Sequence, residues 1–254
     1  AGCCCCDLAL YSTNSTMSPD NEIPFVKKWN NIYNHRGTPD YFNSCAPSVD
    51  PNSLLRFVVH VPDNGMGTSN AHSGSAYVGI AARDNTPAYT EYISVQLSSV
   101  LVVGKQYKAS MFVSLADNSQ FACPGLSMLF TQDQINGGGS AEIVLGYAPQ
   151  VQSLITIIDK QNWVEISGIF TAAGGEEWLQ IGVFNNTAST PVLIAPGASQ
   201  HVAYYYIDDV TVIADGNDCC EDHKLYQNTS NLPALTEVNN FIKACNNLGI
   251  NVSP

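Results

Sequence analysis

The sequence predicts an all-β fold, a β-sandwich or jelly roll, and three observations support this. Short segments rich in β-branched and aromatic residues recur through most of the 254-residue chain. Turn-forming runs such as Asp63-Asn64-Gly65 and Gly137-Gly138-Gly139 separate them. No helical periodicity lies between them, and many short strands at this spacing are typical of a sandwich or jelly roll.

The strand segments follow one another from residue 54 to residue 213. The predicted strands cover residues 54–61, 75–82, 89–97, 106–116, 126–131, 153–158, 163–172, 177–185 and 203–213. Between residues 7 and 50 clear strands are few, and apolar residues there are expected to cover part of the sandwich: Phe25, Val26, Trp29, Ile32 and Tyr33.

Alternation predicts which faces are buried, because successive side chains of a strand point to opposite sides. In 163–170 the buried set is Val164, Ile166, Gly168 and Phe170. In 204–213 strict alternation groups Tyr206, Asp208, Val210 and Val212, opposite Tyr205, Ile207, Asp209, Thr211 and Ile213. It therefore places Asp208 and Asp209 on different faces.

After Ile213 the chain becomes polar and then helical in pattern. Leu235, Val238, Ile242 and Cys245 recur at helical spacing, so a short amphipathic helix is predicted over about 233–247. The expected organisation is a cysteine-rich segment at 1–24, a β-sandwich at 25–213 and a linker, helix and tail at 214–254.

Cysteine usage indicates an oxidising, extracellular compartment. The chain has nine cysteines: Cys3, Cys4, Cys5, Cys6, Cys45, Cys123, Cys219, Cys220 and Cys245. Adjacent cysteines rarely satisfy disulfide geometry with each other, and an odd number leaves at least one thiol free, bound or bonded to another molecule. A disulfide-stapled secreted domain and cross-links between copies both remain open. A metal cluster is less favoured, since no C-x-x-C pair occurs outside the run Cys3 to Cys6 and only His223 follows Cys219 and Cys220.

Charge argues against binding to nucleic acid or to anionic lipid. The formal net charge is −12, from 10 basic and 22 acidic residues, and no basic stripe is present. The sequence contains no signal-peptide pattern and no apolar run of eighteen residues. We therefore expect a secreted or cell-surface chain whose signal peptide has been removed and which does not insert into a membrane.

Catalytic motifs are absent, so an enzyme is not predicted. The chain has no G-x-S-x-G, H-E-x-x-H, Walker or dinucleotide-binding pattern. The Glu176-Glu177 pair lies in a predicted turn and is interpreted as a solvated edge rather than as a glycosidase pair.

Four stretches taken in order resemble a known module. GTPDYFNSCAP (37–47), GSAYVGI (74–80), residues 91–119 and YYYIDDVTV (204–212) are similar to a carbohydrate-binding-module-like jelly roll of secreted Bacteroidota proteins. The resemblance covers roughly residues 25–213. It implies a jelly-roll β-sandwich, a fold that hosts many functions.

The resemblance also implies candidate sites. In such modules an acid of the last strand helps to hold a structural Ca²⁺, which here points to Asp208 and Asp209. The family's opening glutamate is missing, so one expected ligand is lost, and the alternative is an acid that caps a neighbouring loop by hydrogen bonding. The resemblance also suggests that Cys45 bonds to one of Cys3 to Cys6. Cys245 could pair with Cys219 or Cys220, which would leave Cys123 and the surplus N-terminal cysteines for cross-links.

Two functions of different classes follow. The first is a non-catalytic extracellular subunit that self-assembles into a surface fibre or sheath through its termini and cysteines. The alternative is a secreted carbohydrate-binding or adhesive module, since aromatic rings stack on sugars. The candidate contacts with a glycan or with another subunit are Trp29, Trp163 and Trp178; ordinary packing is the other interpretation of Trp163.

Overall fold

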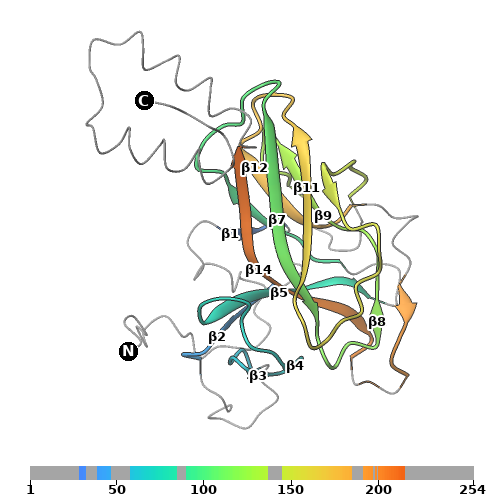
Figure 1. The fold of residues 1–254 in the computed structure, drawn as a ribbon. Helices are drawn as coiled ribbons and strands as arrows, with labels where there is room; N and C mark the ends of the chain where they lie inside the picture. Colours follow the sequence, from blue (N-terminus) through green and yellow to red (C-terminus); the bar gives the residue numbers. More distant parts are fainter. Residues whose placement is uncertain are drawn as a thin grey trace, which may run out of the picture.

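Two antiparallel β-sheets of five strands each form the molecule, and they pack face to face (Figure 1). The computed structural model describes residues 29–32, 39–46, 58–84, 90–136, 145–184, 191–196, 198 and 200–214. Within these ranges every element is a strand, so the all-β, two-sheet prediction is confirmed. The predicted C-terminal helix and the cysteine-rich segment at 1–24 lie outside the described residues.

The first sheet has the order β11-β7-β14-β5-β2. Its strands are β11 (Val164–Thr171), β7 (Gln106–Leu115), β14 (Val202–Ala214), β5 (Ala76–Asp84) and β2 (Asp40–Asn43). Long β14 lies in the centre and pairs with both β7 and β5.

The second sheet has the order β1-β6-β12-β9-β10. Its strands are β1 (Trp29–Asn31), β6 (Ile93–Gln96), β12 (Trp178–Val183), β9 (Leu126–Thr131) and β10 (Val151–Gln152). Two short pairs complete the fold: β3 (Asp63–Asn64) with β4 (Gly67–Thr68), and β8 (Phe121–Ala122) with β13 (Val192–Leu193).

The main core lies between the sheets and is filled by one face of each strand. On β11 the side chains of Val164, Ile166 and Phe170 contact this core, and a Cβ added at Gly168 would touch Val151 at 3.2 Å. The predicted inward set of this strand is therefore confirmed. Ile169, on its other face, is 56% exposed.

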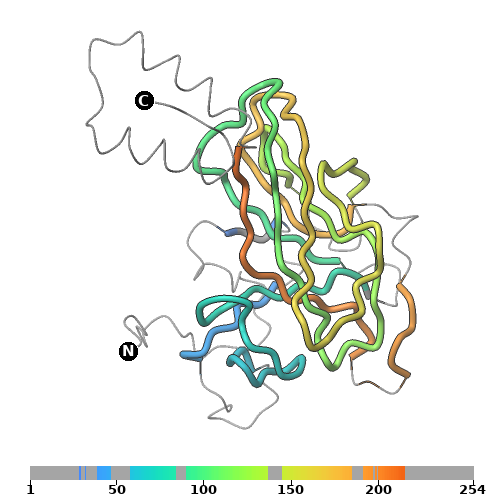
Figure 2. The backbone as a smooth tube through the Cα atoms, in the orientation of Figure 1, coloured from blue at the N-terminus to red at the C-terminus, as the bar shows by residue number. Residues whose placement is uncertain are grey.

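A second apolar cluster covers the outer face of the first sheet. It contains Phe42, Tyr77, Tyr204 and Tyr206 from the strands, with Val61 and Met66 from the segment that follows residue 58. In Figure 2 this segment, in cyan, gathers at the lower end of the molecule near β2. One end of the sheet is thus buried on both sides.

The strict alternation predicted for 204–213 is wrong beyond Asp208. Asp208 of β14 pairs with Phe112 of β7, and Thr211 pairs with Ser110. Two residues of β14, but only one of β7, lie between these pairs, so β14 carries one extra residue, a β-bulge. As a result Val210 and Val212 contact the same core as Tyr205 and Ile207.

Two strand predictions are also wrong within the described residues. Residues 153–158 form no strand, and only Ile157 enters the core. Residues 58–61 likewise form no extended strand, although His60 makes an isolated bridge to Asn43. No helix in the described ranges has the length and apolarity that a membrane crossing requires.

Candidate functional site

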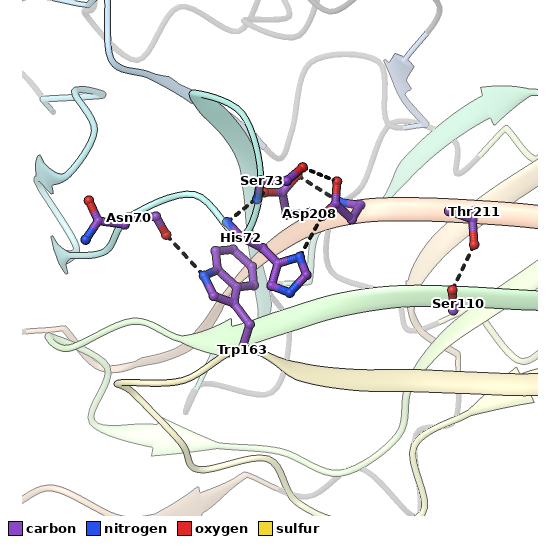
Figure 3. Close-up of polar contacts among 8 residues, drawn as sticks. Asn70, His72, Ser73, Ser110, Trp163, Asp208 and Thr211 are labelled. Atoms are coloured by element: carbon purple, nitrogen blue, oxygen red, sulfur yellow. Dashed lines mark hydrogen bonds and ion pairs between the residues drawn. The ribbon is translucent and has the colours of Figure 1, made fainter.

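The bulge in β14 brings both predicted acids to one short segment, residues 72–73. Asp209 adopts a left-handed backbone, with φ of 47°, a conformation that Asp tolerates better than most residues. The carboxylates of Asp208 and Asp209 consequently contact the same segment rather than opposite faces of the sheet. Figure 3 shows His72 and Ser73 beside Asp208.

Hydrogen-bond donors surround both carboxylates. The backbone N–H groups of His72 and Ser73 donate to one oxygen of Asp208, at 2.9 and 3.2 Å, and the N–H of Asp209 donates to the other at 2.8 Å. Ser73 Oγ donates to Asp209 at 2.6 Å, and His72 Nδ1 lies 2.6 Å from its second oxygen. This arrangement matches a hydrogen-bonded acid that caps a loop.

The two neighbouring carboxyls have pKa values shifted in opposite directions. Hydrogen bonds from Ser73 and His72 lower the pKa of Asp209. Burial raises the pKa of Asp208, and the backbone N–H groups offset this only in part. Asp209 is therefore stabilised as the charged form, whereas ionisation of Asp208 is disfavoured.

Aromatic contacts hold the same loop against the sheet. The His72 ring stacks on Phe112 of β7, with centroids 3.7 Å apart. The indole N–H of Trp163 donates to the carbonyl of Asn70 at 3.1 Å, and its ring meets Tyr77 edge-on at 5.7 Å. Trp163 is thus half-buried against the loop as a packing residue.

Calcium at Asp208 and Asp209 stays a prediction. Their oxygens already accept hydrogen bonds from residues 72–73, and among the described residues no group of three or more His, Cys, Asp or Glu side chains lies close enough to hold a metal ion. A small cavity of about 190 Å³ lies beside the bulge, and its lining brings Trp29 together with Asp208 and Asp209.

The remaining tryptophan and the described cysteines lie elsewhere. Trp178 pairs with Gln96 and Thr131 across the second sheet. Cys45 is disulfide-bonded, and its proposed pairing with the N-terminal cysteines stays a prediction. Cys123 is a buried free thiol, 2% exposed, whose pKa burial raises to about 12. A cross-link through Cys123 would require the sandwich to open.

A larger cleft, of about 560 Å³, lies where β9 ends. Three segments form it: residues 130–136, residues 147–150 and the turn at 173–176 between β11 and β12. Its side chains include Gln132, Asp133, Gln134, Tyr147, Gln150 and Glu176. Its volume lies in the range of small-ligand sites, about 300–1,000 Å³. Trp178 lies next to it, because its cross-strand partner Thr131 lines the cleft.

Hydrogen bonds within the protein fix the walls of this cleft. The Gln150 side chain accepts from the N–H of Phe130 at 2.8 Å and donates to its carbonyl at 3.0 Å, as a neighbouring strand would. Gln132 donates to the carbonyl of Gly174 at 3.0 Å. Ile135 anchors the 132–136 loop in a third apolar cluster with Tyr92 and Phe184. The cleft is therefore preformed.

Glu176 is a structural residue of the cleft wall, not the solvated edge that the sequence predicts. It is only 4% exposed. Its two oxygens accept the N–H groups of Ala173 and Gly174, each at 2.7 Å. These bonds fix a turn in which Gly174 and Gly175 have φ of 98° and 87°, values that favour glycine.

Two cleft residues are available to a ligand. Tyr147 is 46% exposed, and Asp133 is exposed as well. Neither side chain makes a hydrogen bond to another residue in the described part of the chain. The sequence interpretation missed this cleft, although the run of amides and one acid in QDQIN (132–136), directly after a strand, was a usable signal.

Comparisons with known proteins give only distant likenesses. No family model matches the sequence, and no curated protein is significantly similar. The CBM22-1 xylan-binding domain of Paenibacillus barcinonensis Xyn10C shares 15% identity at a TM-score of 0.38, over 74% of this chain and 86% of that one. The K2 cleaved adhesin domain of Lys-gingipain shares 12% at 0.37, over 74% and 89%.

A third similar structure contains the CBM22-1 and GH10 modules of Clostridium thermocellum xylanase 10B, complexed with xylohexaose. It shares 17% identity at a TM-score of 0.35, over 58% of this chain. This chain spans 23% of that one's length. Since all three likenesses are distant, the function of this chain is inferred from its own cleft.

Proposed function

We propose that this chain is a secreted, non-catalytic carbohydrate-binding module that binds a glycan in the cleft at the end of β9. One observation carries the proposal: a preformed cleft of about 560 Å³ combines a half-exposed tyrosine ring with amide and carboxylate side chains. Secretion remains part of the proposal and is supported by the cysteine-rich composition.

The chemistry of a sugar matches these groups. A pyranose ring has an apolar face of C–H groups, which stacks on an aromatic ring, and a rim of hydroxyls that both donate and accept hydrogen bonds. Tyr147 supplies such a ring, while Asp133 and Gln134 are exposed acceptors. Because Gln150, Gln132 and Glu176 fix the walls, little conformational entropy is lost when a ligand binds.

Catalysis by the cleft is not proposed. A glycosidase requires two carboxyls across the scissile bond, one of them a proton donor. Glu176 is buried and its oxygens accept two backbone N–H groups, so Asp133 is left without an available partner among the described residues of the cleft.

Replacing Tyr147 by alanine tests the proposal. In Tyr147→Ala we expect glycan affinity to fall by about tenfold or more, roughly 1.4 kcal/mol, because the stacking surface is lost while no hydrogen bond among the described residues is broken. Binding would be measured by glycan array and then by calorimetry on the polymers that bind.

Ile169→Ala is the matched control. Ile169 is similarly exposed, at 56%, but lies on the outer face of the other sheet. Its replacement should leave affinity unchanged. A wild-type protein that binds no glycan, or equal losses in the two variants, would contradict the proposal.

Self-assembly remains a second candidate because one surface segment is unusually apolar. Leu154, Ile155 and Ile158 are 91%, 66% and 59% exposed, and clustered apolar exposure marks interaction sites. Light scattering of native material shows whether the chain self-associates. Gel electrophoresis under reducing and non-reducing conditions shows whether disulfides link the copies. A monomer under every condition would remove this candidate and leave glycan binding untouched.

A further inference from the structure

We propose that the cleft selects uncharged glycans and rejects those with carboxylate or sulfate groups, and that Asp133 is the residue that sets this preference. The inference rests on the proposed glycan-binding function and names the ligand class for the same cleft. It is carried by the charge and by the hydrogen-bond state of the lining side chains.

Negative charge in the cleft is not balanced by any basic group in its lining. Of the lining residues, Asp133 and Glu176 are acidic and none is Lys, Arg or His. Two N–H groups at 2.7 Å compensate the carboxylate of Glu176. Asp133 is exposed and has no such donor among the described residues, so its charge faces the ligand. The net charge of −12 adds to the same field.

Hydrogen bonding supports the same preference, because each glutamine in the lining already uses one of its two side-chain N–H donors within the protein. Gln132 Nε2 donates to the carbonyl of Gly174 at 3.0 Å, and Gln134 Nε2 to Ser94 Oγ at 2.9 Å. Gln150 uses both ends of its amide on Phe130. Gln132 and Gln134 each keep both lone pairs of the side-chain oxygen but only one N–H, so these two amides offer more acceptor sites than donor sites.

An acceptor-rich, negative cleft suits a ligand that donates hydrogen bonds. Sugar hydroxyls donate readily to carboxylate and amide oxygens. A uronate or sulfate group only accepts, and it would lie near the uncompensated charge of Asp133 without a cation to pair with. The uncharged form of a given polymer should therefore bind more tightly than its anionic form.

Three matched pairs of polymers test this selectivity: arabinoxylan and glucuronoxylan, methyl-esterified and de-esterified homogalacturonan, and dextran and dextran sulfate. In each pair that binds, affinity electrophoresis at low salt should show at least about tenfold tighter binding to the uncharged member. The difference should shrink at about 1 M salt, where the screening length is only about 3 Å.

Asp133→Asn locates the effect. The variant keeps the side-chain shape and removes one negative charge, so in each pair that binds we expect the affinity for the charged member, relative to that for the uncharged member, to rise at least about threefold. Glu165→Gln is the control. Glu165 is exposed on β11 of the other sheet, and its replacement changes the net charge equally without touching the cleft.

The outcomes separate this inference from the function on which it rests. Binding that prefers the anionic members, or an equal response of Asp133→Asn and Glu165→Gln, would overturn the selectivity and leave glycan binding standing. If the wild-type protein binds none of the six polymers and no glycan on an array, the proposed function fails and the selectivity fails with it.

Discussion

Asp208 and Asp209 adjoin in β14 but differ in environment, because a single extra residue breaks the regular pairing with β7. Asp209 lies in the left-handed region, at φ of 47°, and its side chain contacts Ser73 and His72. Asp208 accepts backbone N–H groups, and burial raises its pKa. The two acids that the sequence analysis proposed as calcium ligands thus anchor the loop at 70–73 by hydrogen bonding.

The opposite pKa shifts give opposite effects of pH on stability. Asp209 has a folded pKa below its ordinary value, so its stabilising contribution is present above about pH 4 and is lost as pH falls through the folded pKa. Asp208 has a raised folded pKa, so it disfavours the fold as pH rises from about 4 through that pKa. Because Asp209 is 35% exposed, solvent screens its contribution.

The reactivity of the buried Cys123 thiol can also be predicted from its surroundings. Burial raises its thiol pKa to about 12, so at pH 8 only about one thiol in ten thousand is ionised. In native protein at pH 8, iodoacetamide should leave Cys123 unmodified, while in denaturant it should react fully. Peptide mapping by mass spectrometry measures both, and rapid native modification would show that Cys123 is accessible to cross-linking after all.

At the scale of the elements, close packing at Gly79 of β5 ties the outer aromatic cluster to the first sheet. A Cβ at this position would overlap Tyr204 and would lie 2.6 Å from Phe42. Both rings are buried and belong to the cluster that includes Tyr77 and Tyr206. The strand can approach these rings only because it has no side chain here.

Gly79→Ala should therefore destabilise the fold by about 1–3 kcal/mol, the usual cost of overpacking. Gly146→Ala is the control, since a Cβ there meets nothing within 4 Å and its backbone has no positive φ. Urea unfolding followed by fluorescence compares the two variants. Equal stability of both would mean that the rings around Gly79 are not packed as described.

The strands β11 and β14 show how far sequence patterns can predict strands and their buried faces. Alternation predicted the buried set of β11 because that strand pairs with β7 without irregularity. It failed in β14 because a bulge changes the face of every later residue, and Asp209 alone gives little sign of one. Residue composition, rather than alternation, predicted a strand at 153–158, but no strand forms there, and Leu154 and Ile155 are exposed.

At the scale of the whole molecule, the cleft combines three segments that are remote in sequence. The loop at 132–136 follows β9, residues 147–150 precede β10, and the turn at 173–176 lies between β11 and β12. The spacing of strand and turn segments in the sequence could predict the sandwich, because these signals are local. It could not predict this cleft, because its geometry depends on tertiary hydrogen bonds such as those of Gln150 to Phe130 and of Gln132 to Gly174.

Titration of the ¹⁵N-labelled protein with a glycan oligosaccharide selected from an array, followed by NMR, tests the central claim most directly. Glycan binding at the end of β9 predicts that the shifted amide signals gather at residues 130–136, 147–150 and 173–176, with the 70–73 loop unaffected. Shifts that gather instead around Trp163 and residues 70–73, or no shifts with any oligosaccharide, would contradict it.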